Sequence, residues 1–142
     1  AGNLECGYLT AAFLANGLGT SPDYVRATQI MDTLLMRTNN PFFLYIAGAL
    51  YLEHSAATDT AKGLEYLRRG DLQQDGDCQR ELGAYYAQHA NEPRSLYYWE
   101  RNANNTQDPH RGHSLSVIGY DYLTGWGCKP DKPSNTSEWV LR

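Results

Sequence analysis

The sequence predicts an all-α protein, a right-handed α-solenoid of about three and a half helix-turn-helix repeats. Glycines inside apolar stretches recur as Gly48, Gly83 and Gly119, at spacings of 35 and 36 residues. The turn sequence Gly17-Leu-Gly19 recurs as Gly125-Trp-Gly127 after 108 residues, which is three times 36. A fixed period in this range is typical of helical repeat arrays.

The period divides the chain into four units, which we expect to form a single repeat domain over residues 1–142. Each unit should contain an apolar helix, a polar turn and a second helix. In the first unit, Asn16 to Pro22 carry turn-forming residues, and Ser21 or Asp23 can cap the second helix. The expected units lie near residues 6–40, 41–76, 77–112 and 113–142.

Alignment of the units predicts the core. One set of aromatic side chains should fill the space between each hairpin and the next: Phe13, Tyr51, Tyr86 and Tyr122. The apolar set beside it is Leu9, Ala47, Leu82 and Ile118. A set of small residues should mark the points where two helices cross closely: Thr10, Gly48, Gly83 and Gly119.

The composition of the chain excludes some classes of function. The chain has 142 residues, of which 42% are hydrophobic, enough to form a core. Twelve basic and sixteen acidic side chains give a formal charge of -4, so the basic face of a general nucleic-acid binder is not expected. The sequence contains no apolar run of about 18 residues, so we expect no membrane span. No pattern indicates a cofactor.

These motifs resemble the Sel-one-like repeat (SLR) family, which is related to the tetratricopeptide repeats. The family unit has a Leu-Gly-x-x-Tyr core in its first helix, followed by a Gly-x-Gly turn. Residues 82–86 (Leu-Gly-Ala-Tyr-Tyr) and 118–122 (Ile-Gly-Tyr-Asp-Tyr) match the core, and the two Gly-x-Gly sequences match the turn. The likeness runs from about residue 6 to 142. Two features depart from it, namely Thr10 in place of the first helix glycine and middle turns without the glycine pair.

The resemblance implies a bacterial or eukaryotic interaction scaffold rather than an enzyme. It would bind a partner protein through the concave face of the repeat array, as an adaptor, an inhibitor or an assembly subunit. The partner's identity stays open, and the periplasm or the exterior is slightly favoured over the cytoplasm.

The tetratricopeptide likeness also implies which residues face the groove, namely those three before, one after and four after each helix glycine. These sets are Tyr45, Arg80 and Ser116; Ala49, Ala84 and Tyr120; and Leu52, Ala87 and Leu123. We expect Tyr45, Arg80 and Tyr120 to anchor a partner, with Trp126 extending the site at its rim. Replacing Arg80 or Tyr120 by Ala should weaken binding by about 1–3 kcal/mol and leave the fold intact.

Two alternative functions remain open. His110 and His113 are three residues apart and Asp108 is nearby, a pattern that could hold a metal ion for a metal-assisted hydrolase. The other alternative is a structural subunit of a cell-envelope assembly, which the sequence does not distinguish from a soluble adaptor or inhibitor.

We have two further expectations, one for the cysteines and one for the last helix. Cys6, Cys78 and Cys128 should not be joined to one another, because the repeat register places them too far apart. A last helix from about residue 135 should leave Trp139 and Leu141 with incomplete cover. Since a solenoid needs a polar cap, further residues or another chain would supply that cover, with possible self-association through the C-terminal end.

Overall fold

The computed structural model describes residues 2–19, 21–54 and 59–125, with side chains from residue 4 onward. Within these ranges the chain forms seven α-helices and no strand. It divides into two compact units, Ala1–Gln73 and Gln74–Arg142. The predicted all-α repeat fold is therefore confirmed. None of the helices in the described ranges is long and apolar enough to cross a membrane.

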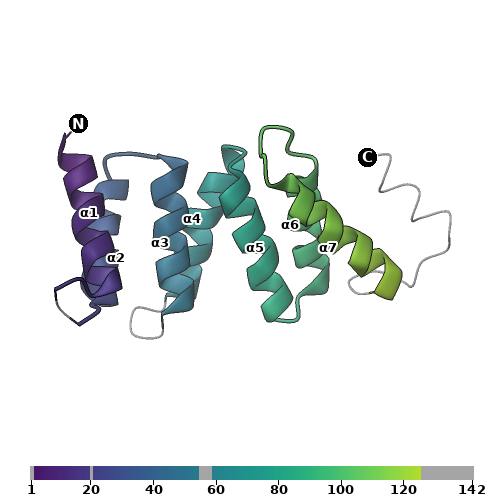
Figure 1. The fold of residues 1–142 in the computed structure, drawn as a ribbon, viewed down its shortest axis with the longest axis horizontal. Helices are drawn as coiled ribbons and strands as arrows, with labels where there is room; N and C mark the ends of the chain where they lie inside the picture. The colour runs from purple at the N-terminus through teal and green to yellow at the C-terminus, as the bar shows by residue number, and fades with distance from the viewer. Residues whose placement is uncertain (1, 20, 55–58, 126–142) are drawn as a thin grey trace. The chain divides into compact units, whose positions relative to one another are not determined.

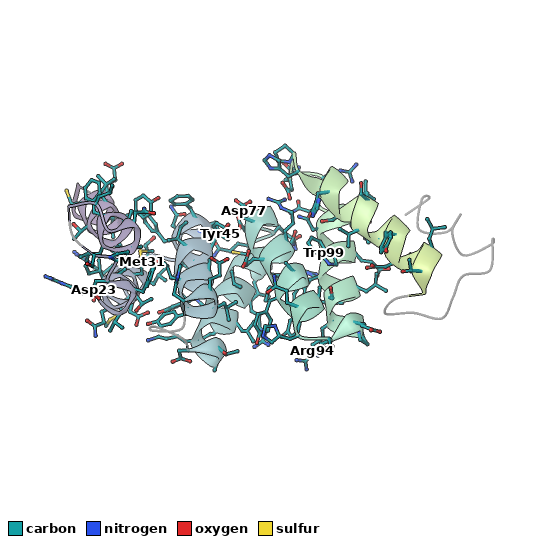
Figure 2. All side chains as sticks on the ribbon, turned by 60° about the horizontal axis from the view of Figure 1, so that its bottom comes forward. Asp23, Met31, Tyr45, Asp77, Arg94 and Trp99 are labelled. Atoms are coloured by element: carbon teal, nitrogen blue, oxygen red, sulfur yellow. The ribbon has the colours of Figure 1, made fainter. Side chains whose placement is uncertain are left out.

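The first unit contains two helix hairpins (Figure 1). Helix α1 (Gly2–Asn16) packs against α2 (Tyr24–Leu35), and α3 (Pro41–Glu53) packs against α4 (Thr60–Leu72). Helices α2 and α3 also contact each other, which joins the two hairpins. Their shared core includes the fully buried side chains of Met31 and Leu44, and Figure 2 labels Met31.

The second unit contains one complete hairpin and one further helix. Helix α6 (Glu92–Ala103) packs against both α5 (Gly76–Gln88) and α7 (Arg111–Thr124). Helix α7 ends at Gly125, which has the left-handed φ of 75° that favours glycine. The described chain thus holds three hairpins and the first helix of a fourth, as predicted. The expected helix from residue 135 lies outside the described residues.

In each of the three hairpins for which the structure describes both helices, a side-chain cap starts the second helix. In each case a polar side chain accepts a hydrogen bond from the backbone N–H three residues further on, which satisfies one of the free donors of the helix end. The third hairpin lacks the glycine pair that ends the first one, and Ala90 there adopts the left-handed φ of 53°. The turn between α5 and α6 therefore reverses the direction of the chain without a glycine. The capping residues are Asp23, Asp59 and Asn91.

Close helix crossings occur at two of the predicted glycines. A Cβ atom at Gly48 would lie 2.6 Å from Cγ of Leu67 and 3.1 Å from the carbonyl oxygen of Gly63. A Cβ atom at Gly83 would lie 2.8 Å from the ring of Trp99. Contacts this short are not tolerated, so α3 and α5 can approach their partner helices only where a side chain is missing. The prediction for these two positions is confirmed.

The predicted register of the first helix is wrong. Leu9 and Phe13, expected in the core, are 49% and 51% exposed, and Thr10 is exposed as well. Ala11 is buried instead, at a spacing of 37 from Gly48 rather than the assumed 38. Because one residue turns an α-helix by about 100°, this shift moves the whole apolar set to another face. The stripe that packs on the core is Leu4, Tyr8, Ala11, Leu14 and Ala15.

The aromatic set otherwise behaves as expected. Tyr51 and Tyr86 are buried, and Tyr122 is partly buried against the core of the second unit. The hydroxyl group of Tyr122 donates a hydrogen bond to Glu100 at 3.1 Å. Large aromatic side chains thus fill the space between helices in both units.

We predict that Gly83→Ala lowers the free energy of unfolding of the second unit by about 1–3 kcal/mol, because the rigid Trp99 ring leaves no room for a Cβ atom. Gly112→Ala is the matched control, since nothing lies within 4 Å of its Cβ position. The control should be neutral or slightly stabilising, because alanine favours helices over glycine. Denaturant unfolding of both variants tests the crossing, and equal stabilities would refute it.

Candidate functional site

The structure places four of the five predicted site residues. Tyr45 lies half-buried on α3 in the first unit. Arg80 lies on α5, and Ser116 and Tyr120 lie on α7 in the second unit. Ser116 and Tyr120 are exposed and four residues apart, so they share one face of α7. Trp126 lies outside the described residues.

A hollow of about 590 Å³ opens beside Tyr120 in the second unit. Residues from α5, α6 and α7 line it, and its size is typical of small-ligand sites. Two of its residues, Ala87 and Tyr120, belong to the sets expected to face the groove. The lining residues are Ala87, Glu92, Trp99, Val117, Tyr120, Asp121, Thr124 and Gly125.

The helices fix the polar and aromatic groups of this hollow. Trp99 lies under Gly83 at the α5–α6 crossing and is 6% exposed; Figure 2 labels it within the second unit. Glu92 follows directly after the capping residue Asn91, so it sits at the start of α6. Asp121 lies on the buried face of α7 and is 4% exposed. Tyr120, next to it in the sequence, is 66% exposed at the rim.

Asp121 has unusual electrostatics. Burial of the carboxyl group, together with the negative charge of Glu92, raises its pKa to about 6. Both effects act against the ionised form. Ionisation of the Asp121 carboxyl group at neutral pH therefore lowers the free energy of unfolding.

Arg80 does not present a free guanidinium group. Its side chain is only 17% exposed and pairs with both Asp77 and Asp108. Burial of Asp108 would raise its pKa, but hydrogen bonds from the Asn102 side chain (2.6 Å) and the His110 backbone N–H (2.9 Å), with the charge of Arg80, outweigh this and lower it. Arg80 thus holds the carboxylate that anchors the loop between α6 and α7. The expectation that Arg80→Ala leaves the fold intact is not compatible with this arrangement.

A buried polar cluster surrounds this pair, and the sequence analysis missed it. Ser114 donates to Asn102 Oδ1 at 2.6 Å, which ties α7 to α6. Asn102 and Asn105 both donate to Gln79 Oε1, at 3.3 and 2.9 Å, which ties α6 and the following loop to α5. All four side chains are buried, and nothing in their spacing distinguishes them from ordinary surface residues.

The first unit has a comparable polar centre at Asp32. Its carboxylate accepts hydrogen bonds from Tyr51 and Tyr66, each at 2.7 Å, and from Lys62 at 2.5 Å. Burial, with the hydrogen bond to Asp32, raises the pKa of both tyrosine hydroxyls. Asp32 therefore joins α2 to α3 and α4, and it explains why tyrosine rather than phenylalanine occupies the core position at 51.

The two histidines of the alternative hydrolase hypothesis have separate surroundings. The His110 side chain is 73% exposed, and its Nδ1 lies 3.7 Å from Asp108 Oδ1. The His113 ring packs edge-on against Trp99 with 5.6 Å between ring centres. In the part of the chain that the structure describes, no three His, Cys, Asp or Glu side chains come together to hold a metal ion. The hydrolase hypothesis therefore has no set of ligands there.

The cysteines that the structure describes are unlinked. Cys6 is exposed in the first unit, and Cys78 is fully buried on α5 in the second. The prediction that these two cysteines are not joined to each other is therefore confirmed. Cys128, Trp139 and Leu141 lie outside the described residues.

Comparison with known proteins supports the fold. No protein-family model matches the sequence, and no match is found among curated proteins. Among solved structures, the chain is similar to a Sel1 repeat protein from Oxalobacter formigenes, with a TM-score of 0.68 and 17% sequence identity. The match covers 97% of this chain and 56% of the other. The chain therefore has the helical solenoid fold of a Sel1 repeat protein and spans little more than half the length of that relative.

We predict that Arg80→Ala lowers the free energy of unfolding by about 1–3 kcal/mol, because it leaves the buried Asp108 carboxylate without its cation. Arg94→Ala, which removes an exposed arginine of α6, should cost less than about 1 kcal/mol. Denaturant unfolding at neutral pH compares the two variants. Equal losses would show that the Arg80–Asp108 pair does not support the fold.

We predict that Asp121→Asn raises the free energy of unfolding at neutral pH by about 1–2 kcal/mol. The folded-state pKa of about 6 lies above the ordinary value of 3.8, so the folded protein holds this proton more tightly. In the native protein this residue thus adds stability as pH falls from about 6 towards 4, and the asparagine variant should lack that gain. Parallel stability profiles of the two proteins between pH 4 and pH 7 would contradict the assignment.

Proposed function

We propose that this protein is an interaction scaffold that binds a partner protein through the groove-facing side of its first helices. The binding centre is the hollow beside Tyr120. In this proposal the chain acts as a single repeat domain, Ser116 and Tyr120 extend the binding surface along α7, and Tyr45 holds a groove-facing repeat position on α3 of the first unit. Arg80 contributes to this surface indirectly, because it pairs with Asp108 and so supports the loop between α6 and α7.

The observation that carries the proposal is the pairing of an exposed aromatic side chain with a concave surface. Tyr120 is 66% exposed and Leu123 is 73% exposed, although both are large side chains in an ordered helix. Tyrosine at the edge of a pocket is a common anchor of protein interfaces, because its ring buries a large area at a small entropic cost. The hollow next to it provides the shape that such interfaces need.

The helical repeat fold supports the same conclusion. A solenoid exposes equivalent positions of successive helices side by side, which creates an extended surface suited to another polypeptide. The similarity to the Sel1 repeat protein extends over 97% of this chain, so the surface is built on a repeat framework. The identity of the partner is not specified by these features.

We predict that Tyr120→Ala weakens binding of the native partner by about 1–3 kcal/mol, because it removes the anchoring ring without disturbing a buried group. Tyr97→Ala is the matched control, since Tyr97 is also an exposed tyrosine of the second unit but lies on the second helix of its hairpin. The partner is captured from the native host with the unaltered protein, and its affinity for each variant is then measured by calorimetry. If Tyr120→Ala binds as well as Tyr97→Ala, this face of α7 is not the binding surface.

A further inference from the structure

We propose that a hollow in the first unit, between α1, α2 and α3, receives a large apolar side chain of the partner polypeptide. The hollow has a volume of about 250 Å³, and residues from all three helices line it. This inference rests on the proposed function, because it assigns the hollow to the same partner. It adds a second point of contact, in the other unit, and the chemistry that this contact recognises.

The corrected register of α1 places this hollow on the groove-facing surface. Ala11 takes the position of the helix glycine in the first repeat. The residues three before, one after and four after it are then the groove-facing set of α1. All three of them line the hollow, namely Tyr8, Ala12 and Ala15. The hollow therefore belongs to the same surface that the proposed function assigns to the partner.

Equivalent repeat positions line the hollow beside Tyr120 in the second unit. In both hollows the lining includes the residues two before and two after the helix glycine, and the first residue of a hairpin's second helix. In the first unit these are Ile46, Leu50 and Tyr24, and in the second unit they are Val117, Asp121 and Glu92. The two units thus repeat one kind of hollow, and carboxyl groups line it only in the second unit.

Aromatic contacts hold the helices around the hollow of the first unit. Tyr8 of α1 contacts Phe42 and Phe43 at the start of α3, with 5.2 and 5.6 Å between ring centres. Tyr24, at the start of α2, stacks on His54, which follows the last residue of α3, with 3.7 Å between ring centres. Between these contacts α1 contributes alanines to the lining, and their small side chains leave the space unfilled.

The lining favours an uncharged, apolar occupant. None of the described residues that line the hollow carries a carboxylate, ammonium or guanidinium group. A charged side chain would lose water there without gaining an opposite charge, which is unfavourable. Ile46, Leu50 and the alanines instead offer apolar surface that a leucine or phenylalanine side chain would remove from water. A volume of about 250 Å³ suits one such side chain and is below the usual range of small-molecule sites.

Ile46 provides a reporter inside the hollow, because the chain has only two other isoleucines, Ile30 and Ile118, and neither lines it. The complete chain is labelled at its isoleucine methyl groups, and the Ile46 signal in nuclear magnetic resonance is assigned with Ile46→Val. Two short alanine peptides, blocked at both ends, carry either a central leucine or a central asparagine, which has nearly the same shape but is polar. We expect the leucine peptide to shift the Ile46 signal and the asparagine peptide to bind about 10-fold more weakly or worse.

A variant that fills the hollow completes the test. Ala15→Leu should weaken binding of both the leucine peptide and the native partner by about 10-fold, because its own side chain takes the space. Thr10→Leu is the matched control, since it adds a leucine at an exposed position of the same helix outside the hollow, and it should leave both affinities unchanged. The Ile30 and Ile118 signals show whether each variant is folded.

Three results with the peptides and the variant would each overturn the inference: equal binding of the two peptides, no shift of the Ile46 signal with either peptide, or unchanged affinities in Ala15→Leu. A shift of the Ile46 signal with protein concentration alone would show that a second copy of the chain fills the hollow, and would overturn it as well. The proposed function would survive all of these results as long as Tyr120→Ala still weakens the native partner.

Discussion

The structure depends on the close crossing of the two helices within each hairpin. At Gly48 and Gly83 the first helix approaches the second so closely that a single added carbon atom would overlap Leu67 or Trp99. Ser95 strengthens one crossing by donating a hydrogen bond to the carbonyl oxygen of Gly83 at 2.8 Å. Because dispersion contacts fall off steeply with separation, these approaches decide how well each hairpin packs. They also hold Trp99 in the position from which it lines the hollow.

Polar centres within each unit add specificity to this packing. Asp32 joins three helices of the first unit, and Asn102 with Asp108 joins the three helices of the second. Buried polar groups are tolerated only when they are satisfied, so each centre restricts how the neighbouring helices can pack. In the second unit this restriction extends to the proposed binding surface, because Ser114 and Tyr120 both lie on α7. The exposed face of α7 is thus presented by a helix whose buried face is fixed.

The sequence predicts the repeat from Gly48 onward because Gly48 and Gly83 mark backbone approaches that exclude a side chain. The same reasoning gives the first helix the wrong register. In that helix Ala11, rather than a glycine, lies at the position equivalent to Gly48. For the candidate site, register alone finds Ala87 and Tyr120, which line the hollow. It does not find Trp99 or Asp121, because their place in the hollow depends on how α7 packs against the α5–α6 hairpin. The sequence does not predict the polar centres either, because the residues that form each centre come from distant parts of the chain.

The central claim is that a partner polypeptide binds at the hollow of the second unit, and cross-linking at its rim tests it most directly. A photoreactive phenylalanine derivative replaces Tyr120 in one protein and Tyr97, on the second helix of its hairpin, in another. After illumination with the native partner, mass spectrometry locates the joined residues. The account predicts cross-links from position 120 to the partner, and few from position 97. Equal cross-linking from both positions, or cross-links from position 97 alone, would contradict it.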